Sequence, residues 1–250
     1  MDDANPATRL ADRALLRING DDVRGFLQGL VTRDVRLVAP GAPQWAGLLT
    51  PQGKVLFDFI LWDDGDAVLI DCEAAQAEPL ARRLAMYRLR RAIEIARVED
   101  AAVHWSPVAP PEETMAAQDP RLDRLGWRWL GALGGSAAPN WHAHRLALGV
   151  TEGVAELGNG TTLWLECNAE PLNGVSYDKG CFIWQENTAR MHYRAKINRR
   201  LVVVASADAA PEPRATYPEL GLAVEQRRIE ALGAALKPDW LVAALAGEDG

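Results

Sequence analysis

The segment from residue 54 to residue 71 predicts a β-hairpin, and this pattern restricts the fold of the chain strongly. Alternate residues of its first part share one face of a strand: Val55, Phe57, Phe59 and Leu61. Asp58 lies on the opposite face among apolar neighbours. The run Asp63-Asp64-Gly65-Asp66 supplies the turn into a second strand at residues 67–71. We therefore expect two antiparallel strands with one carboxylate on an otherwise apolar face.

Further strands and helices follow in irregular order. Residues 13–18, 93–98 and 200–205 have the composition of strands. Apolar residues at helical spacing predict one helix from Val23 to Leu30 and another that begins near Pro79. Because strands and helices do not alternate regularly, the sequence favours an α+β fold over a doubly wound sheet.

The composition is typical of a globular protein. Hydrophobic residues make up 48% of the 250 residues, which is close to the globular average and provides for a large core. No apolar run approaches the roughly 20 residues that span a bilayer, so we expect no membrane association. The acidic start at residues 1–6 lacks the apolar stretch of a secretory signal, which predicts a cytoplasmic protein. The net charge of −7 argues against direct nucleic-acid binding.

Cys181 is the candidate reactive thiol. It follows Lys179 and precedes a run of cations, and a nearby positive charge lowers the pKa of a cysteine. Cys72 and Cys167 stand beside carboxylates, which disfavour a thiolate. Three cysteines without Cys-x-x-Cys spacing predict neither a disulfide framework nor a zinc site. They also argue against an iron–sulfur cluster held by one chain alone, because such clusters usually take four thiolates.

Cations gather towards the C-terminal part of an otherwise acidic chain. They are Lys179, Arg190, Arg194, Lys196, Arg199 and Arg200. A local basic cluster of this kind favours a small anionic ligand over a polyanion. The alternative is a solvated strand edge with weak salt bridges.

Two further candidates carry ionisable side chains. Asp58 could accept a hydrogen bond from a ligand N–H in a partly apolar pocket, where burial would raise its pKa. It could equally be an edge carboxylate that is hydrogen-bonded to a loop. His142 and His144 could share one face of a strand, but no third ligand stands nearby, so we predict no metal site.

One motif resembles the signature of a known family. The YgfZ-type folate-binding proteins have a sequence similar to Lys179-Gly180-Cys181-Phe182-Ile183-Trp184-Gln185-Glu186-Asn187-Thr188-Ala189-Arg190. These are iron–sulfur cluster assembly and repair factors related to the T-protein of the glycine cleavage system, an aminomethyltransferase. Similar blocks occur in the same order at residues 25–35, 49–58, 87–90, 119–128, 145–150 and 166–168.

The resemblance implies a T-protein-like fold of three subdomains around a central cavity, the last a small β-barrel-like piece. We expect an N-terminal folate-binding α+β subdomain at residues 1–105 and a second α+β subdomain with the Lys-Gly-Cys motif at 106–198. A short C-terminal β subdomain follows at 199–250. Residues 106–120, which include four prolines, predict a linker or long loop at the first boundary.

The resemblance also implies tetrahydrofolate as the ligand and Cys181 as the catalytic group. Basic motif residues suit the carboxylates of the folate tail, and an acid suits the N–H groups of the pterin ring. The expected folate-binding residues are Asp58, Glu166, Lys179, Gln185, Glu186, Arg190 and Arg194. The implied partners are iron–sulfur assembly proteins or cluster-containing client enzymes, tRNA-modifying ones included.

Departures from the family pattern leave two alternatives to a folate-binding accessory factor. Asp58 stands alone where the T-protein has a pair of acids, and Ala147 stands where it has another acid. Both losses argue against the first alternative, a folate-dependent aminomethyltransferase. Trp184 stands where the family usually has glycine, which permits close backbone approach. The second alternative is therefore a relative that no longer binds folate and acts through protein contacts.

Overall fold

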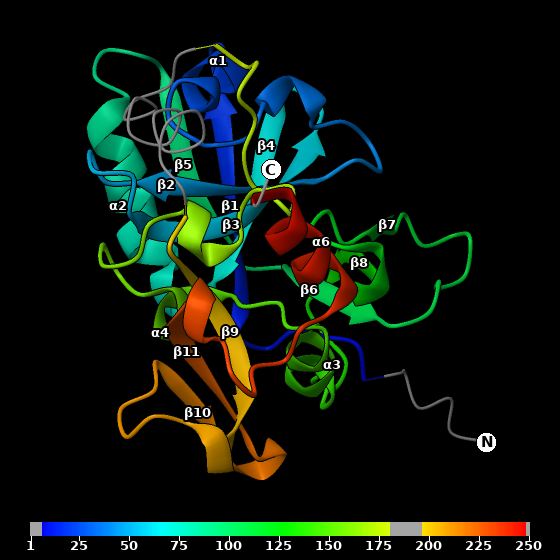
Figure 1. The fold of residues 1–250 in the computed structure, drawn as a ribbon. Helices are drawn as coiled ribbons and strands as arrows, with labels where there is room; N and C mark the ends of the chain where they lie inside the picture. The colour runs from blue at the N-terminus through cyan, green and yellow to red at the C-terminus, as the bar shows by residue number, and fades with distance from the viewer. Residues whose placement is uncertain (1–6, 181–196, 249–250) are drawn as a thin grey trace, which may run out of the picture.

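The computed structural model describes residues 7–180 and 197–248, and its first unit is a five-stranded antiparallel sheet. The strand order is β2-β3-β4-β1-β5 (Figure 1). The strands are β1 Arg13–Gly20, β2 Gln44–Leu49, β3 Val55–Asp64, β4 Ala67–Glu73 and β5 Ile93–Val98. Helices α1 (Val23–Gln28) and α2 (Ala77–Tyr87) pack on one face of this sheet and form a core with it. The predicted hairpin is thus confirmed as β3 and β4.

The predicted face of β3 is correct except at its first residue. Phe59 and Leu61 pack into the core with α1 and α2, as expected. Val55 was expected on the same face, but it packs into the core on the opposite side of the sheet with Ile60. The reason is a β-bulge: the pairing of β2 with β3 is irregular after Leu48, and one extra residue reverses the alternation.

Two smaller sheets complete the described fold. The second contains β6 Ala101–Ser106, β7 Ala117–Gln118 and β8 Trp127–Ala132, in the order β6-β8-β7. The third contains β9 Arg199–Ala205, β10 Ala215–Tyr217 and β11 Leu222–Arg228, in the order β10-β11-β9. In Figure 1 this third sheet lies at the opposite end of the molecule from α1. Mixed helix and sheet without regular alternation confirms the α+β class.

The remaining helices are short. The α-helices are α3 Trp141–Ala147, α4 Gly153–Leu157 and α6 Asp239–Glu248. The 3₁₀ helices are η1 Val35–Leu37, η2 Ala74–Gln76, η3 Asp123–Leu125, η4 Leu165–Cys167, η5 Ser206–Asp208, η6 Pro218–Leu220 and η7 Ile229–Ala231. The boundary expected between residues 105 and 106 falls inside β6. The three-subdomain division, the central cavity and the barrel-like C-terminal piece stay predictions.

A tryptophan-rich core fills the space between the first and second sheets. Trp45 of β2 and Trp164 are both buried, with ring centroids 4.7 Å apart. Gly174 allows this packing, because a β-carbon there would lie 2.7 Å from the Trp45 ring. Trp105 and Trp141 form a second pair in the same core, with centroids 5.1 Å apart. The large aromatic side chains therefore hold the first two sheets together.

A chain of buried ion pairs connects the same two sheets. Asp71 of β4 lies 2.6 Å from Arg13 of β1 and 3.0 Å from Arg128 of β8. Asp119 lies 2.7 Å from Arg128 and 2.8 Å from Arg121. The side chains of Asp71, Asp119 and Arg128 are 0% exposed. Because an unpaired charge in a protein interior is costly, each of these carboxylates depends on its arginines.

The chain of ion pairs continues to α3 and the third sheet. Glu152 lies 2.7 Å from Arg121 and 3.3 Å from Arg145, and Arg145 lies 2.7 Å from Glu156. Tyr217 of β10 donates a hydrogen bond to Glu156. Burial alone would raise the pKa of Glu152, but the charges of Arg145 and Arg121 outweigh it and hold that pKa well below its usual range. The network thus joins three sheets.

Candidate functional site

Asp58 lies in β3, which is flanked by β2 and β4, so it is not an edge carboxylate. Its side chain is buried: the residue is 7% exposed. One carboxylate oxygen accepts a hydrogen bond from the Gly153 N–H at 3.1 Å, and the other accepts one from Trp45 Nε1 at 3.4 Å. Burial raises the pKa of Asp58, opposed by the charge of Arg13. The expected direction of this pKa shift is confirmed.

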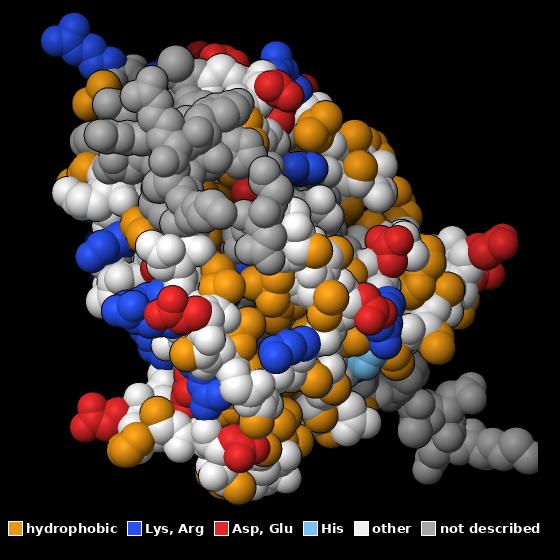
Figure 2. Space-filling view, viewed as in Figure 1, with side chains coloured by type: hydrophobic (Ala, Val, Ile, Leu, Met, Phe, Trp, Pro, Cys, Tyr) orange, Lys and Arg blue, Asp and Glu red, His pale blue; other side chains and the backbone are white. Residues whose placement is uncertain are grey.

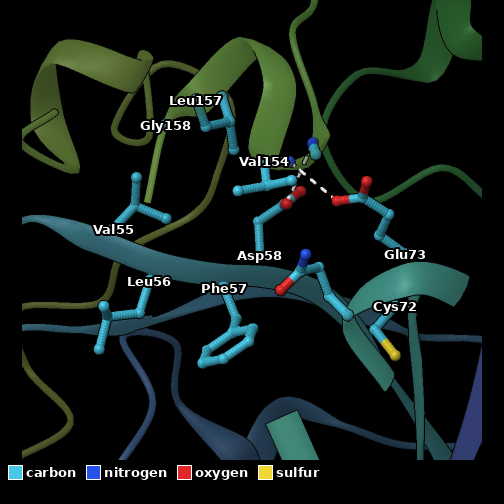
Figure 3. Close-up of a pocket in the computed structure, with 11 residues that line it drawn as sticks. Val55, Leu56, Phe57, Asp58, Cys72, Glu73, Val154, Leu157 and Gly158 are labelled. Carbon is cyan, nitrogen blue, oxygen red and sulfur yellow. Dashed lines mark hydrogen bonds between the residues drawn. The ribbon is translucent and has the colours of Figure 1, made fainter. Parts of the chain in front are cut away.

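A second carboxylate lies beside Asp58 in a small cavity under α4. Glu73 of β4 accepts a hydrogen bond from the Val154 N–H at 2.8 Å (Figure 3). Burial raises the pKa of Glu73 as well. The two acids point towards the start of α4 and line a cavity of about 10 Å³, which is room for one water molecule. The site is therefore a pair of carboxylates covered by backbone N–H groups.

Sequence reasoning missed Glu73, although a signal for it existed. In the β3–β4 pairing Phe59 lies opposite Cys72, so Asp58 and Glu73 follow as the next pair along the two strands. Residues opposite each other in antiparallel strands point to the same side of the sheet. Counting back from a two-residue turn at Gly65-Asp66, inside the predicted turn segment, pairs Asp64 with Ala67 and so places Glu73 opposite Asp58.

Replacing Glu73 by glutamine is expected to change how stability depends on pH. Because the folded pKa of Glu73 is raised above its ordinary value of 4.5, the folded protein holds this proton more tightly than the unfolded chain. The parent therefore loses stability as pH rises through that raised pKa. Glutamine keeps an acceptor for Val154 N–H but carries no charge. From about pH 4 to about pH 7, the urea midpoint of the variant should therefore rise relative to that of the parent. A difference that stays constant over this range would contradict the assignment.

Cys72 and Cys167 are unsuited to thiolate chemistry. Both are buried, Cys72 in the core under α1 and α2 and Cys167 in the tryptophan-rich core. Burial, more than the neighbouring acids, raises the pKa of Cys72 to about 12 and that of Cys167 well above its usual value. The expectation that these two thiols stay protonated is confirmed, with burial as the larger cause.

Lys179 joins the Lys-Gly-Cys motif to the end of α1. Its Nζ donates to the carbonyl oxygens of Gln28, at 2.7 Å, and of Val31. In return, the Gln28 side-chain amide donates to the Lys179 carbonyl oxygen at 3.1 Å. A lysine suits the carbonyl groups left unpaired where a helix ends. Burial lowers the pKa of Lys179 to about 8. We call these reciprocal bonds of Lys179 and Gln28 the α1 anchor.

Glu166 and Arg200 lie at the junction with the third sheet. Glu166 accepts a hydrogen bond from Gln226 Nε2 of β11 at 2.8 Å, and burial raises its pKa. Arg200 of β9 is buried and donates to the Asn168 side-chain oxygen at 2.9 Å. Part of the predicted basic cluster is therefore internal rather than placed on a solvated edge.

The described residues do not bring the predicted folate ligands together. Neither Glu166 nor Lys179 lines the cavity at Asp58. The other expected site residues lie outside the described residues: Cys181, Gln185, Glu186, Arg190 and Arg194. Trp184 lies outside them too. The roles given to all of these residues stay predictions.

The two histidines considered as metal ligands lie in helix α3 rather than on a strand. His142 Nε2 lies 3.2 Å from an Asp12 carboxylate oxygen, and His144 Nε2 lies 2.9 Å from the Arg124 carbonyl oxygen. Within residues 7–180 and 197–248, no three His, Cys, Asp or Glu side chains are grouped to hold a metal ion. No helix in these ranges is long and apolar enough to cross a membrane.

The fold defines the class of protein. The structure is similar to the crystal structure of glycine cleavage system aminomethyltransferase T from Bartonella henselae, with a TM-score of 0.61. The likeness covers 78% of this chain and 64% of that chain at 12% sequence identity. At this identity the comparison establishes the fold alone, so the chain has the T-protein fold, as predicted.

Sequence comparison then gives the family. The chain is 37% identical over 238 residues to the human iron-sulfur cluster assembly factor IBA57, mitochondrial, covering 81% of this chain and 67% of that protein. It is 36% identical to the mouse protein and 28% identical to a Neurospora crassa homolog, of which it covers 65% and 59%. The chain therefore belongs to the IBA57 family of iron-sulfur cluster assembly factors. No protein-family model matches the chain.

These relatives confirm one expectation and contradict another. They are cluster assembly factors, as the resemblance implied, while the narrower YgfZ-type assignment stays a prediction. They are also mitochondrial proteins, so the expected cytoplasmic localisation is wrong. The composition of six residues does not distinguish between compartments.

Proposed function

We propose that this protein supports iron–sulfur cluster assembly and uses the Cys181 thiol in cluster handling with partner proteins. The observation that carries the proposal is the 37% identity with the human assembly factor. The structure supports it by exclusion, since Cys72 and Cys167 are buried with raised pKa values. Iron–sulfur clusters are held by cysteine thiolates, usually four. Cys181 alone cannot supply such a set, so the partner, an assembly protein or a client enzyme, provides the others.

Replacing Cys181 by serine tests this proposal. We expect the variant to fold like the parent but to lose the support that the parent gives to a cluster-containing enzyme, because a hydroxyl does not replace a thiolate as an iron ligand. The measurement is the activity of that enzyme in cells depleted of the parent protein and supplied with each variant. Cys72→Ala is the matched control, since its thiol is buried. Full activity of Cys181→Ser would overturn the proposal.

Tetrahydrofolate is the ligand that we propose from the resemblance. The described cavity at Asp58 does not fit a pterin ring, because it has room for one water molecule and both Asp58 oxygens already accept hydrogen bonds. Binding there requires α4 to move away from Asp58 and Glu73. Calorimetric titration with tetrahydrofolate should give saturable heat that Asp58→Ala abolishes.

The small size of this cavity favours a second candidate, an assembly factor that works without folate. This alternative expects no heat of binding from the parent and no loss of cluster-enzyme support when Asp58 is replaced by asparagine. If Trp184 is what closes the pocket, Trp184→Gly should restore the heat. The Cys181→Ser experiment does not depend on which candidate holds.

A further inference from the structure

A groove on the second sheet lies apart from the Asp58 cavity and from the α1 anchor. It is formed by the paired strands β6 and β8 and the loop at residues 107–116, and its volume is about 630 Å³. Trp105 of β6 packs into the tryptophan-rich core, so the groove, which contains His104 and Trp129, is on the other face of the sheet. Small-molecule sites in proteins typically measure about 300–1,000 Å³. This groove has the size of a small-molecule site.

An aromatic platform forms one wall. His104 and Trp129 are opposite each other in the β6–β8 pairing, and their rings stack with centroids 5.5 Å apart at 13°. Gly131 permits this arrangement, because a β-carbon there would lie 3.2 Å from the His104 ring. His104 is further fixed by Ala132 and Thr8: its Nε2 lies 3.2 Å from the Ala132 carbonyl oxygen and its Nδ1 lies 3.0 Å from the Thr8 hydroxyl. A rigid flat surface of this kind suits a flat ligand.

Two side chains with hydrogen-bond donors, Ser106 and Trp129, line the groove. The Ser106 hydroxyl oxygen accepts from the Val108 N–H at 3.3 Å, which leaves the hydroxyl proton to donate elsewhere. Among the described residues, the half-buried Trp129 forms no side-chain hydrogen bond through its indole N–H. A ligand with an acceptor atom on its edge would satisfy such donors.

The charge of the groove disfavours an anion. Of the described residues that line it, none is lysine or arginine. The loop over it has the exposed acids Glu112 and Glu113 beside the exposed apolar side chains of Val108 and Met115. Figure 2 shows hydrophobic side chains in the region of β7 and β8, with acidic side chains at the outer edge of that region. A carboxylate or phosphate would meet repulsion here without a compensating cation.

We propose that this groove binds a planar heteroaromatic molecule without negative charge, packed against Trp129 with an acceptor atom towards Ser106. The site depends neither on Cys181 nor on folate, and the anionic folate tail is a poor match for it. It would be a second small-molecule site on an assembly factor.

The test uses quinoline, a flat neutral ring with one acceptor nitrogen, and quinoline-4-carboxylate, the same ring with a negative charge. Binding is followed by the indole N–H signals of ¹⁵N-labelled full-length protein, with the Trp129 signal identified by its loss in Trp129→Leu. Gly134→Phe fills the groove from its rim, since a β-carbon at Gly134 meets no atom within 4 Å. Gly247→Phe is the matched control, because a β-carbon at Gly247 also meets no atom within 4 Å and Gly247 does not line the groove.

We expect quinoline to shift the Trp129 signal saturably, and the carboxylate to bind at least about tenfold more weakly because of the acidic rim. Gly134→Phe should weaken quinoline binding by a similar factor, while Gly247→Phe should bind like the parent. The proposal is overturned if quinoline causes no saturable shift, or if Gly134→Phe binds as well as Gly247→Phe. Equal or tighter binding of the carboxylate would also overturn it.

Discussion

Asp119→Asn is expected to destabilise the protein by about 3–5 kcal/mol, the usual result of removing one charge from a buried ion pair. The carboxylate of Asp119 lies between Arg121 and Arg128, and the side chains of these three residues are at most 1% exposed. The asparagine amide would direct N–H donors at guanidinium groups that are themselves donors. Two arginine charges would then be buried with fewer partners. Urea-induced unfolding, followed by far-UV circular dichroism, measures the loss.

Asp64→Asn is the matched control for this prediction. Asp64 also forms an ion pair, with Arg17 at 2.7 Å, but the two side chains are 37% and 44% exposed. Exposed pairs of this kind contribute about 0–1 kcal/mol. If Asp119→Asn lowers stability no more than Asp64→Asn does, the buried network is not what joins the sheets.

The same buried ion pairs make the stability of the folded protein depend on pH in the acidic range. Burial acts to raise the pKa of Asp119, but the charges of Arg121 and Arg128 outweigh it, so its pKa lies below the ordinary value of 3.8. A carboxylate with a lowered folded pKa stabilises the protein above its unfolded pKa, and this contribution is lost as pH falls through the folded pKa. The parent should therefore lose stability as pH falls below 3.8 and through the lowered pKa of Asp119. Asp119→Asn has no carboxylate at this position, so it should lose less stability over the same pH interval.

The sequence predicted local elements well where a two-residue or helical period was clear. β5 spans Ile93–Val98, the predicted range, and α2 buries Leu80 and Leu84 as its spacing indicated. The failure at Val55 came from a bulge, which no alternation pattern contains. Bulges depend on how two strands pair, and that is decided by tertiary packing.

Of the candidate site, the sequence predicted the position of Asp58 on its strand but not the partners that contact it. Alternation placed Asp58 on its face of β3, but its donor Gly153 is 95 positions away in the sequence. The ion-pair network was not predicted either: only Asp119, Arg121, Arg128 and Arg145 lie in the family blocks at 119–128 and 145–150, and the blocks do not indicate which charges pair. Three-dimensional pairing of charges has no sequence period, so spacing could not predict it.

Lys179→Met is expected to destabilise the protein by about 1–3 kcal/mol, because it removes the donor from two carbonyl groups at the end of α1. Lys179 is 148 and 151 positions from its two acceptors, so the α1 anchor fixes a distant segment in place. Exposed Lys237 provides the matched control: Lys237→Met should change stability by less than about 0.5 kcal/mol.

The pH dependence distinguishes the α1 anchor from simple packing. Burial lowers the pKa of Lys179 to about 8 from the ordinary 10.5, so between these values the unfolded chain holds a proton that the folded protein has released. The parent therefore gains stability relative to Lys179→Met as pH rises from 8 to 10.5. Urea midpoints of both proteins across that range provide the measurement, and a difference that does not grow would mean that Lys179 is not buried on α1. Because Cys181 is two residues further along the chain, Lys179→Met should also reduce the support of cluster-enzyme activity, and Lys237→Met should not.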